Sequence, residues 1–373
     1  MLTVCFARRA VLRADDVSTS GPGVRMVRLQ TARAVGVLGP GSTVTGALAG
    51  AAEDVVAGDV DAAVRLAVEL GRAMPLPASG RTLERWELLA SVAAVDLTAA
   101  RVLEAHSDAL AVLAESGEAP VPPGGSWGVF AAEQPGTRLT AHGDDGTGWT
   151  LTGRKPWCSL AGRLTHALVT AHAGDRPRLF AVSLTHPGVS VVPDTWHARG
   201  LADVTSGPID LVDVPATPVG DPGWYLRRPG FAHGGIGVAA CWFGGAVGVA
   251  RALRSAARRR PMDQLAAWHL GEVDVELTTA RAVLRESAAA VDAHRAQGAD
   301  GEDLALRARA VVAGSAERIL ARVGHALGPA PLTLDDDHAR RVADLTVYLR
   351  QHHAERDLAR LGESVAAATV DPW

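Results

Sequence analysis

Hydrophobic and polar positions along the chain follow three successive patterns. The first pattern, from about residue 42 to residue 117, is rich in Ala, Leu and Val, and an apolar stripe at helical spacing begins at Leu89. Thr82 stands where a helix N-cap is expected, because its hydroxyl can accept a hydrogen bond from the first turn. Gly117 and the Pro and Gly residues after it are typical of a helix end. This region is therefore predicted to be helical.

The second pattern, from about residue 126 to residue 222, consists of short apolar runs that Gly and Pro separate. The clearest runs read WTLTG, HALVTA, RLFAVSL, GVSVVP and PIDLVDVP. Runs of this length, rich in β-branched residues and bounded by turn residues, are typical of β-strands. Their spacing predicts a small antiparallel barrel or sandwich.

The third pattern is helical again and continues to the end of the chain. Pro261 suits a first helical turn, and an apolar stripe follows at heptad spacing from Leu270. A second stripe runs from Leu304 and closes at Gly324. We predict one last helix over about residues 338–365.

Helices, then strands, then helices predict an α+β fold, because a βαβ fold would alternate the two. The boundaries fall at the changes of pattern. We expect a loose N-terminal arm over residues 1–38 and a helical N-terminal domain over 39–124. A middle antiparallel β-barrel-like domain follows over 125–222, and a C-terminal four-helix bundle over 223–373.

Composition excludes several functional classes. Apolar residues make up 47% of the 373 residues, which excludes a mostly disordered chain. The formal charge of −4 gives no attraction toward nucleic acid or anionic lipid. Cys5, Cys158 and Cys241 are isolated and form no disulfide framework or zinc motif, so no metal is expected. No uninterrupted apolar run reaches the ~18 residues of a membrane span, and the N-terminal arginines do not suit a signal peptide, so we expect a cytoplasmic protein.

Local motifs resemble those of the acyl-CoA dehydrogenase superfamily. The segment FAAEQPGTRLTAHGDDGTGWTLTGRKPWCSLAGRLTHALVTA is similar to the family's Thr-Glu-Pro loop and its Gly-Lys-x-Trp-Ile-Thr strand pair. GLADVTSGPIDLVDVP resembles the stretch that closes the family's β-domain, and FGGAVGVARAL resembles its first bundle helix. The likeness covers roughly residues 42–367. It implies the acyl-CoA dehydrogenase fold and an FAD cofactor.

The resemblance also implies which residues contact the flavin. Trp157, Cys158 and Ser159 match the family's Trp-Ile-Thr, in which the indole packs on the flavin and the third residue bonds near flavin N5. From the residues alone, a core Trp and a strand Ser are the alternative. Three further positions, whose backbone faces the ring in the family, are matched by Val129, Ala131 and Ala132.

The family's phosphate contacts are matched less closely. An Arg before Phe-Gly meets the FAD pyrophosphate across the subunit interface in the family, whereas this chain reads RSAARRRPMDQL. Arg258, Arg259 or Arg260 could meet the phosphates through charge-assisted bonds, or could simply complement a helix dipole. Gly324 lies where the family's Gly-rich turn lets another chain's cofactor approach.

The family's catalytic base has no carboxylate counterpart here. Dehydrogenation of an acyl thioester requires a base for the α-proton. Counting from Asp344, which fits the family's Arg-Asp pair, places the usual Glu at His352 in VYLRQHHAERDLARLG. The second known placement corresponds to about Gly234–Gly235. His352 could act as the base, since its reference pKa is about 6.5. It could also be a polar residue flanking a helix, and Glu355 is one turn away.

Flavin monooxygenases of the same fold offer another interpretation. They often read Cys-Ser where dehydrogenases read Ile-Thr, and they use histidines near the last helix and in the N-terminal domain. This chain has Cys158–Ser159, His352–His353 and His106. The resemblance implies that such groups stabilise a flavin hydroperoxide, with FMN in place of FAD. His106 by itself is equally typical of a hydrogen-bonded core histidine.

Three hypotheses follow from the sequence. The first is a dehydrogenase that takes hydride from an acyl thioester onto FAD and passes electrons to an electron-transfer flavoprotein. The second is a monooxygenase of a small substrate, supplied with reduced flavin by a flavin reductase. The third is a non-catalytic paralogue that pairs with an active subunit. The resemblance implies a homodimer or homotetramer.

Overall fold

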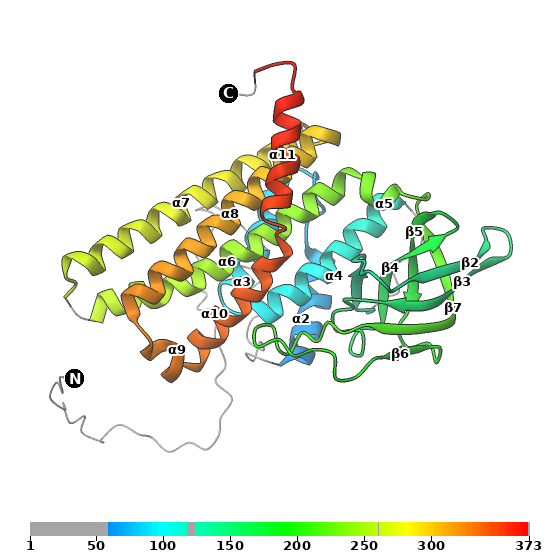
Figure 1. The fold of residues 1–373 in the computed structure, drawn as a ribbon, viewed down its shortest axis with the longest axis horizontal. Coiled ribbons are helices and arrows are strands. Elements are labelled where there is room, and N and C mark those ends of the chain that lie inside the picture. Colours follow the sequence, from blue (N-terminus) through cyan, green and yellow to red (C-terminus); the bar gives the residue numbers. More distant parts are fainter. Residues whose placement is uncertain (1–58, 118–123, 260, 372–373) are drawn as a thin grey trace.

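The computed structural model describes residues 59–117, 124–259 and 261–371. The predicted N-terminal arm lies outside the described residues. Figure 1 shows a β-barrel at one end of the long axis, with helices filling the rest of the molecule. The predicted α+β order of helices, strands and helices is confirmed.

The first helical region contains three helices with clear capping signals. They are α2 (Val60–Ala73), α3 (Thr82–Ala93) and α4 (Leu97–Ser116). Asp59 accepts a hydrogen bond from Ala62 N at 2.9 Å, and Asp96 accepts one from Ala99 N at 2.8 Å, so both carboxylates cap a first turn. Gly117, with φ 68°, ends α4 in the left-handed conformation.

Thr82 has a different role from the predicted one. It is the first residue of α3 and not its N-cap, and the cap residue Arg81 makes no side-chain cap bond. The Thr82 hydroxyl instead donates to Asp292 Oδ1 at 2.6 Å, at the end of a distant helix. Because this partner is 210 residues away, local sequence could not reveal it.

The strands form a barrel that closes on itself. They are β1 (Trp127–Phe130), β2 (Leu139–Asp144), β3 (Gly148–Lys155), β4 (His166–Ala173), β5 (Arg176–Ser183), β6 (Val189–Val191) and β7 (Ile209–Val219). The pairing order is β1-β4-β2-β3-β7-β5, and the additional β4–β5 pairing completes the ring. The five runs identified in the sequence all fall in strands.

Not every pair in the barrel is antiparallel. β1 runs parallel to β4, from Trp127 opposite His166 to Phe130 opposite Val169. A parallel pair needs a long connection, and the whole β2–β3 hairpin lies between these two strands. β2 also pairs with β4 in parallel, with Thr140 opposite His172. The barrel is therefore mainly antiparallel, with two parallel pairings to β4.

The remaining elements form the helical C-terminal region. They are α5 (Trp224–Arg227), α6 (Pro229–Arg259), α7 (Gln264–Asp292), α8 (Gly298–Leu327), α9 (Ala330–Leu334), α10 (Asp336–Tyr348), the 3-10 helix η3 (Leu349–Gln351) and α11 (Glu355–Ala367). α6 is the central helix and contacts α3, α4, α7, α8 and α10. At its crossing with α3, a Cβ on Gly244 would lie only 2.1 Å from Ala90 O, so a glycine is required there.

α6 is also long and apolar enough to cross a membrane, and it is the one such helix in the described part of the chain. Of its most apolar window, 83% is buried inside the protein. Packing in the core therefore accounts for its apolar character without a membrane.

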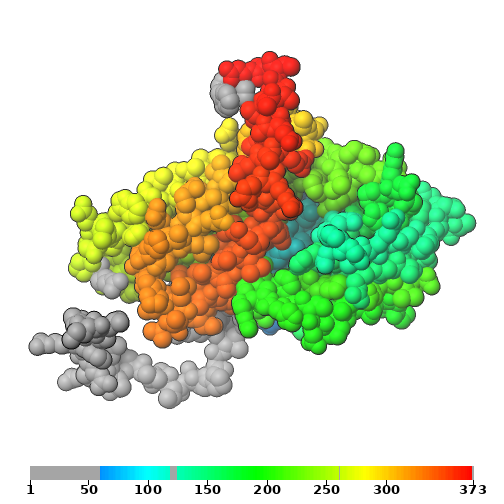
Figure 2. Space-filling model, in the orientation of Figure 1, coloured from blue at the N-terminus to red at the C-terminus, as the bar shows by residue number. Residues whose placement is uncertain are grey.

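The predicted last helix is interrupted. In place of one helix over residues 338–365, α10 and η3 end at Gln351 and α11 begins at Glu355. Ala354, between them, has φ 47° and ψ −113°, which is incompatible with a continuous helix. Figure 1 shows α11 leaving the body of the molecule in a different direction from α10, and Figure 2 shows the same segment, in red, projecting from the rest of the surface.

The barrel is tied to the C-terminal helices through α10. Asp344 accepts a hydrogen bond from Leu201 N at 2.6 Å, in the loop between β6 and β7. A Cβ on Gly200 would lie 1.9 Å from Ala343 O, so the two backbones approach as closely as a glycine allows. This contact fixes the distance between the barrel loop and the segment that carries His352.

Candidate functional site

The loop after β3 carries three of the predicted flavin-contact residues. Trp157 is 52% exposed and has φ 59°, so its indole stands on the surface of the loop. Cys158 is buried, and its thiol donates to Lys155 O at 3.3 Å. The Ser159 hydroxyl lies 2.8 Å from the Ser206 hydroxyl. Trp157 therefore presents an exposed aromatic ring, and Ser159 presents a partly buried hydroxyl. The Cys158 side chain packs in the hydrophobic core.

Burial also determines the chemistry of Cys158. It raises the pKa of the thiol to about 12, because a thiolate in the core would lose its hydration. Cys158 is thus a neutral packing residue at neutral pH and not a nucleophile.

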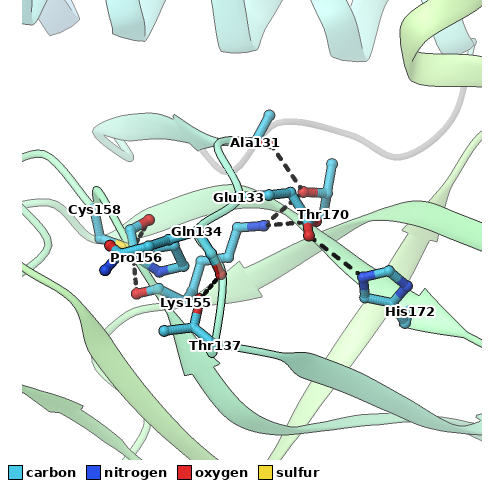
Figure 3. A network of polar contacts seen from close by, with 9 residues as sticks. All are labelled: Ala131, Glu133, Gln134, Thr137, Lys155, Pro156, Cys158, Thr170 and His172. Atoms are coloured by element: carbon cyan, nitrogen blue, oxygen red, sulfur yellow. Dashed lines mark hydrogen bonds and ion pairs between the residues drawn. The ribbon is translucent and has the colours of Figure 1, made fainter.

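A buried lysine supports the neighbouring loop, as Figure 3 shows. Lys155 Nζ donates to the Thr170 hydroxyl at 2.7 Å and lies 3.6 Å from Glu133 Oε1. Thr170 in turn donates to Ala131 O at 3.4 Å. Burial lowers the pKa of Lys155, and the Glu133 carboxylate acts in the opposite direction. The amine thereby links the end of β3 to β4 and to the segment after β1.

The three predicted backbone contacts lie at the end of β1. Val129 is in the strand and half-buried, whereas Ala131 and Ala132 follow its last paired residue. Both alanines are small and at least partly exposed. Together with the Trp157 indole, these positions offer small side chains, free edges and an aromatic face to a ligand.

The two adjacent histidines between η3 and α11 face in different directions. The His353 side chain is 70% exposed, with Nδ1 at 3.4 Å from Asp357 Oδ1. The His352 side chain is only 10% exposed, and its Nε2 has no hydrogen-bond partner among the described residues. Its ring meets Trp242 edge-on, with 6.2 Å between centroids. Burial, and then the charge of Arg309, lower the pKa of His352, so its imidazole is neutral at neutral pH.

The second family position holds glycines, as the sequence indicates, but a carboxylate lies beside it. A Cβ on Gly234 would be 2.8 Å from Asp108 Oδ1, so this α4 side chain reaches the face of α6. Arg309 Nη1 donates to Gly235 O at 3.0 Å. Sequence reasoning missed both Asp108 and Arg309, because each comes from a helix distant in sequence. Glu355, the other acid considered, is exposed.

Comparison with known proteins agrees with this architecture. The acyl-CoA dehydrogenase C-terminal domain family matches residues 221–349, which include α6 through α10. Butyryl-CoA dehydrogenase from Megasphaera elsdenii superposes with a TM-score of 0.69 and 15% identity, over 82% of this chain and 89% of that one. The chain has the acyl-CoA dehydrogenase fold.

Other proteins of similar structure carry different chemistry. KijD3, solved with FMN and a dTDP-linked amino keto sugar, has a TM-score of 0.66 and 22% identity over 83% of this chain and 84% of its own. TdsC from Paenibacillus sp. A11-2, solved with FMN and indole, has a TM-score of 0.68 and 17% identity over 85% and 97%. No curated protein matches by sequence. At such identities the likeness establishes the acyl-CoA dehydrogenase fold and not the reaction.

His106 does not join His352 in this acyl-CoA dehydrogenase fold. It is buried, and its Nδ1 accepts a hydrogen bond from Trp127 N at 3.2 Å. A Cβ on Gly71 would lie 2.6 Å from its Cδ2, so α2 covers the ring. Burial lowers its pKa to about 4. His106 is a neutral residue that joins α4 to β1, and its contacts are not shared with His352.

The described residues considered for phosphate binding lie on α6 and α8, not on the barrel. Arg258 and Arg259 are exposed at the end of α6, while Arg260 lies outside the described residues. Gly324 is inside α8 with open space beside its Cα. The C-terminal ends of α6 and α8, which carry Arg258, Arg259 and Gly324, lie at the end of the bundle away from the barrel (Figure 1). Among the described residues, no group of three or more His, Cys, Asp and Glu is placed to hold a metal.

Proposed function

We propose that this protein is a flavin-dependent oxidoreductase that dehydrogenates an acyl thioester, with His352 in the place of the usual carboxylate base. The observation that carries the proposal is the buried His352 Nε2, which has no partner among the described residues. A buried polar atom without a partner calls for an explanation, and a catalytic role is one such explanation. Among the described residues with such an atom, His352 is the one that also stands at the family's base position. The match of residues 221–349 to an acyl-CoA dehydrogenase domain supports the same reaction.

The residues around Trp157 suit a flavin. An exposed indole, two alanines at the end of β1 and the Ser159 hydroxyl form a donor and stacking set for a flat ring. The bound flavin would supply hydride acceptance. We assign Trp157 to stacking on its ring and Ser159 to a hydrogen bond at its edge. Lys155 holds the segment at Ala131 that borders the ring.

His352 has the properties of a general base. Its lowered pKa keeps the imidazole neutral, so that Nε2 can accept a proton at neutral pH. The Trp242 ring packs edge-on against the imidazole. At the other family position, the Asp108 carboxylate lies beside Gly234 and is a candidate acid there.

The second candidate is a monooxygenase, and one observation favours it. The group at the base position is an imidazole, and Ser159 follows Cys158 as in the monooxygenases of this fold. KijD3 and TdsC, both solved with FMN, have this architecture. In this reading Ser159 and His352 donate hydrogen bonds, and reduced flavin comes from a separate reductase.

An absorbance spectrum and an anaerobic titration test both proposals. The purified protein is expected to bind FAD or FMN and to lose its flavin absorbance when a suitable acyl thioester is added without oxygen. His352→Ala is expected to slow this bleaching by at least ~100-fold, because a general base typically contributes that much. His325→Ala, which removes an exposed histidine near the end of α8, is the matched control and should bleach at the unchanged rate.

Two outcomes would contradict the dehydrogenase. If no acyl thioester bleaches the flavin, and a substrate instead drives oxygen uptake with reduced flavin, the protein is a monooxygenase. If neither FAD nor FMN binds, the non-catalytic paralogue is correct and both enzymatic proposals fail.

A further inference from the structure

Arg309 lies at the junction of α6, α8 and the break that carries His352. Its Nη1 donates to Gly235 O at 3.0 Å, and its Nη2 donates to Gln351 O at 2.7 Å. The guanidinium carbon is 4.7 Å from the centre of the Trp242 ring, within the range of a cation–π contact. One side chain therefore connects the central helix to the residue immediately before His352.

These contacts explain why the chain breaks where it does. The Gln351 carbonyl, at the end of η3, is bonded to a side chain of α8, and Ala354 then takes a conformation that no helix allows. Asp357 completes the turn by accepting a hydrogen bond from His353 N at 3.2 Å. The break thus depends on tertiary contacts and is not a frayed helix end.

The guanidinium also has an unusual set of partners. No carboxylate of the described chain lies within ion-pair distance of Arg309, whose bonds go to two backbone carbonyls. Asp357 and Glu104 act on it only from farther away. Because no adjacent carboxylate neutralises it, its positive charge acts on the neighbouring imidazole in a region of low dielectric constant.

Four charged or titratable groups face His352. Arg309 on α8 and His353 disfavour its protonation, whereas Asp357 on α11 and Glu317 on α8 favour it. The nearest carboxylate oxygen is Asp357 Oδ2, 3.9 Å from Nε2. From α6, the Trp242 ring packs against the imidazole in a T-shaped arrangement.

We propose that Arg309 is a positioning residue, which holds the break between α10 and α11 against α6 and keeps the His352 ring turned inward. The positive charge of Arg309 beside the ring also disfavours protonation of the imidazole. The inference rests on the proposed function only in giving His352 a catalytic task. The placement of Arg309 can be tested in the ligand-free chain.

The test is an NMR titration of the full chain without ligand. The His352 signal in the ¹H–¹³C spectrum is assigned by its loss in His352→Gln. In Arg309→Met the proton affinity of His352 is expected to rise on the order of tenfold, because a like charge beside the ring is removed. Arg307→Met removes a charge from the exposed face of α8, where Arg307 pairs with Asp303 at 3.4 Å, and should leave the His352 titration unchanged.

Arg309→Lys separates the two parts of the proposal. A lysine keeps the positive charge but lacks the planar fork that reaches two carbonyls at once. The His352 titration is expected to stay near that of the wild type, while amide exchange at His352 and His353 becomes faster. If Arg309→Met does not fold, the amide exchange of Arg309→Lys still tests the positioning role.

Either of two results would overturn the proposal: an unchanged His352 titration in folded Arg309→Met, or amide exchange at His352 and His353 in Arg309→Lys that is no faster than in the wild type. Failure of the proposed function is separate. It would appear if an acyl thioester bleached the flavin of His352→Ala at the wild-type rate, whatever the titrations show.

Discussion

Asp344 is expected to give the protein a pH-dependent stability that one substitution removes. Its carboxylate is buried where α10 meets the loop before β7, and it accepts a hydrogen bond from Leu201 N at 2.6 Å. Burial raises the pKa of Asp344 from 3.8 to about 6, although the bond from Leu201 and the charge of Arg340 act in the opposite direction.

The sign of the effect follows from the two pKa values. The folded-state pKa is the higher one, so the folded protein binds this proton more tightly than the unfolded chain. The resulting stabilisation is complete below about pH 3.8 and is lost as the pH rises through about 6. A pKa difference of about two units between the folded and unfolded states contributes about 3 kcal/mol to the free energy of unfolding at low pH. About 1.4 kcal/mol of this contribution is present at about pH 5.

The assay compares the wild type with Asp344→Asn, which keeps an oxygen for Leu201 N but does not titrate. Urea unfolding at several values between about pH 5 and about pH 8 gives the free energy of unfolding of each protein. The wild type should gain about 1.4 kcal/mol relative to the variant over this range as the pH falls. The contributions of other titrating groups cancel when the free energy of unfolding of the variant is subtracted from that of the wild type at the same pH. A difference that stays constant, or that increases with pH, would refute the reasoning.

Two further predictions concern the core. Gly244→Ala should lower the free energy of unfolding by about 1–3 kcal/mol, because the new Cβ would meet Ala90 O at 2.1 Å. Gly271→Ala, whose new Cβ has nothing within 4 Å, should raise the free energy of unfolding by up to ~1 kcal/mol. Equal urea midpoints for the two variants would contradict this prediction. Cys158 and Cys241 are buried with raised pKa values and should react with a thiol reagent only in denaturant, so rapid reaction of either in the native protein would show that its surroundings open.

The order of helices and strands could be predicted because its signals are local. Apolar spacing indicated five of the seven described strands, β3 to β7, and Gly117 ended α4 as expected. The break before α11 could not be predicted in this way. It depends on Arg309, about 40 residues earlier, and on Gly235 in another helix. Read alone, the sequence around Ala354 is compatible with a continuous helix.

The candidate site could be predicted only in part for the same reason. Motif resemblance pointed to Trp157, Ser159 and His352. In the structure the Trp157 indole is exposed, the Ser159 hydroxyl contacts that of Ser206, and His352 Nε2 has no hydrogen-bond partner within the described part of the chain. The sequence could not distinguish the inward His352 from the outward His353, since neighbouring residues differ only in the direction that the fold gives them. It could not separate His106 from them either, because that role depends on the Trp127 amide.

The parallel course of α6 and α8 has a consequence for phosphate binding. Arg309 meets Gly235 near one end of the bundle, while Gly324 lies fifteen residues farther along α8, about 22 Å away. The C-terminal end of α6, which carries Arg258, lies at that same far end of the bundle, away from the barrel (Figure 1). We therefore expect that a flavin resting on Trp157 takes no phosphate contact from Arg258 or Gly324, and that a phosphate bound at those two residues would belong to a different molecule.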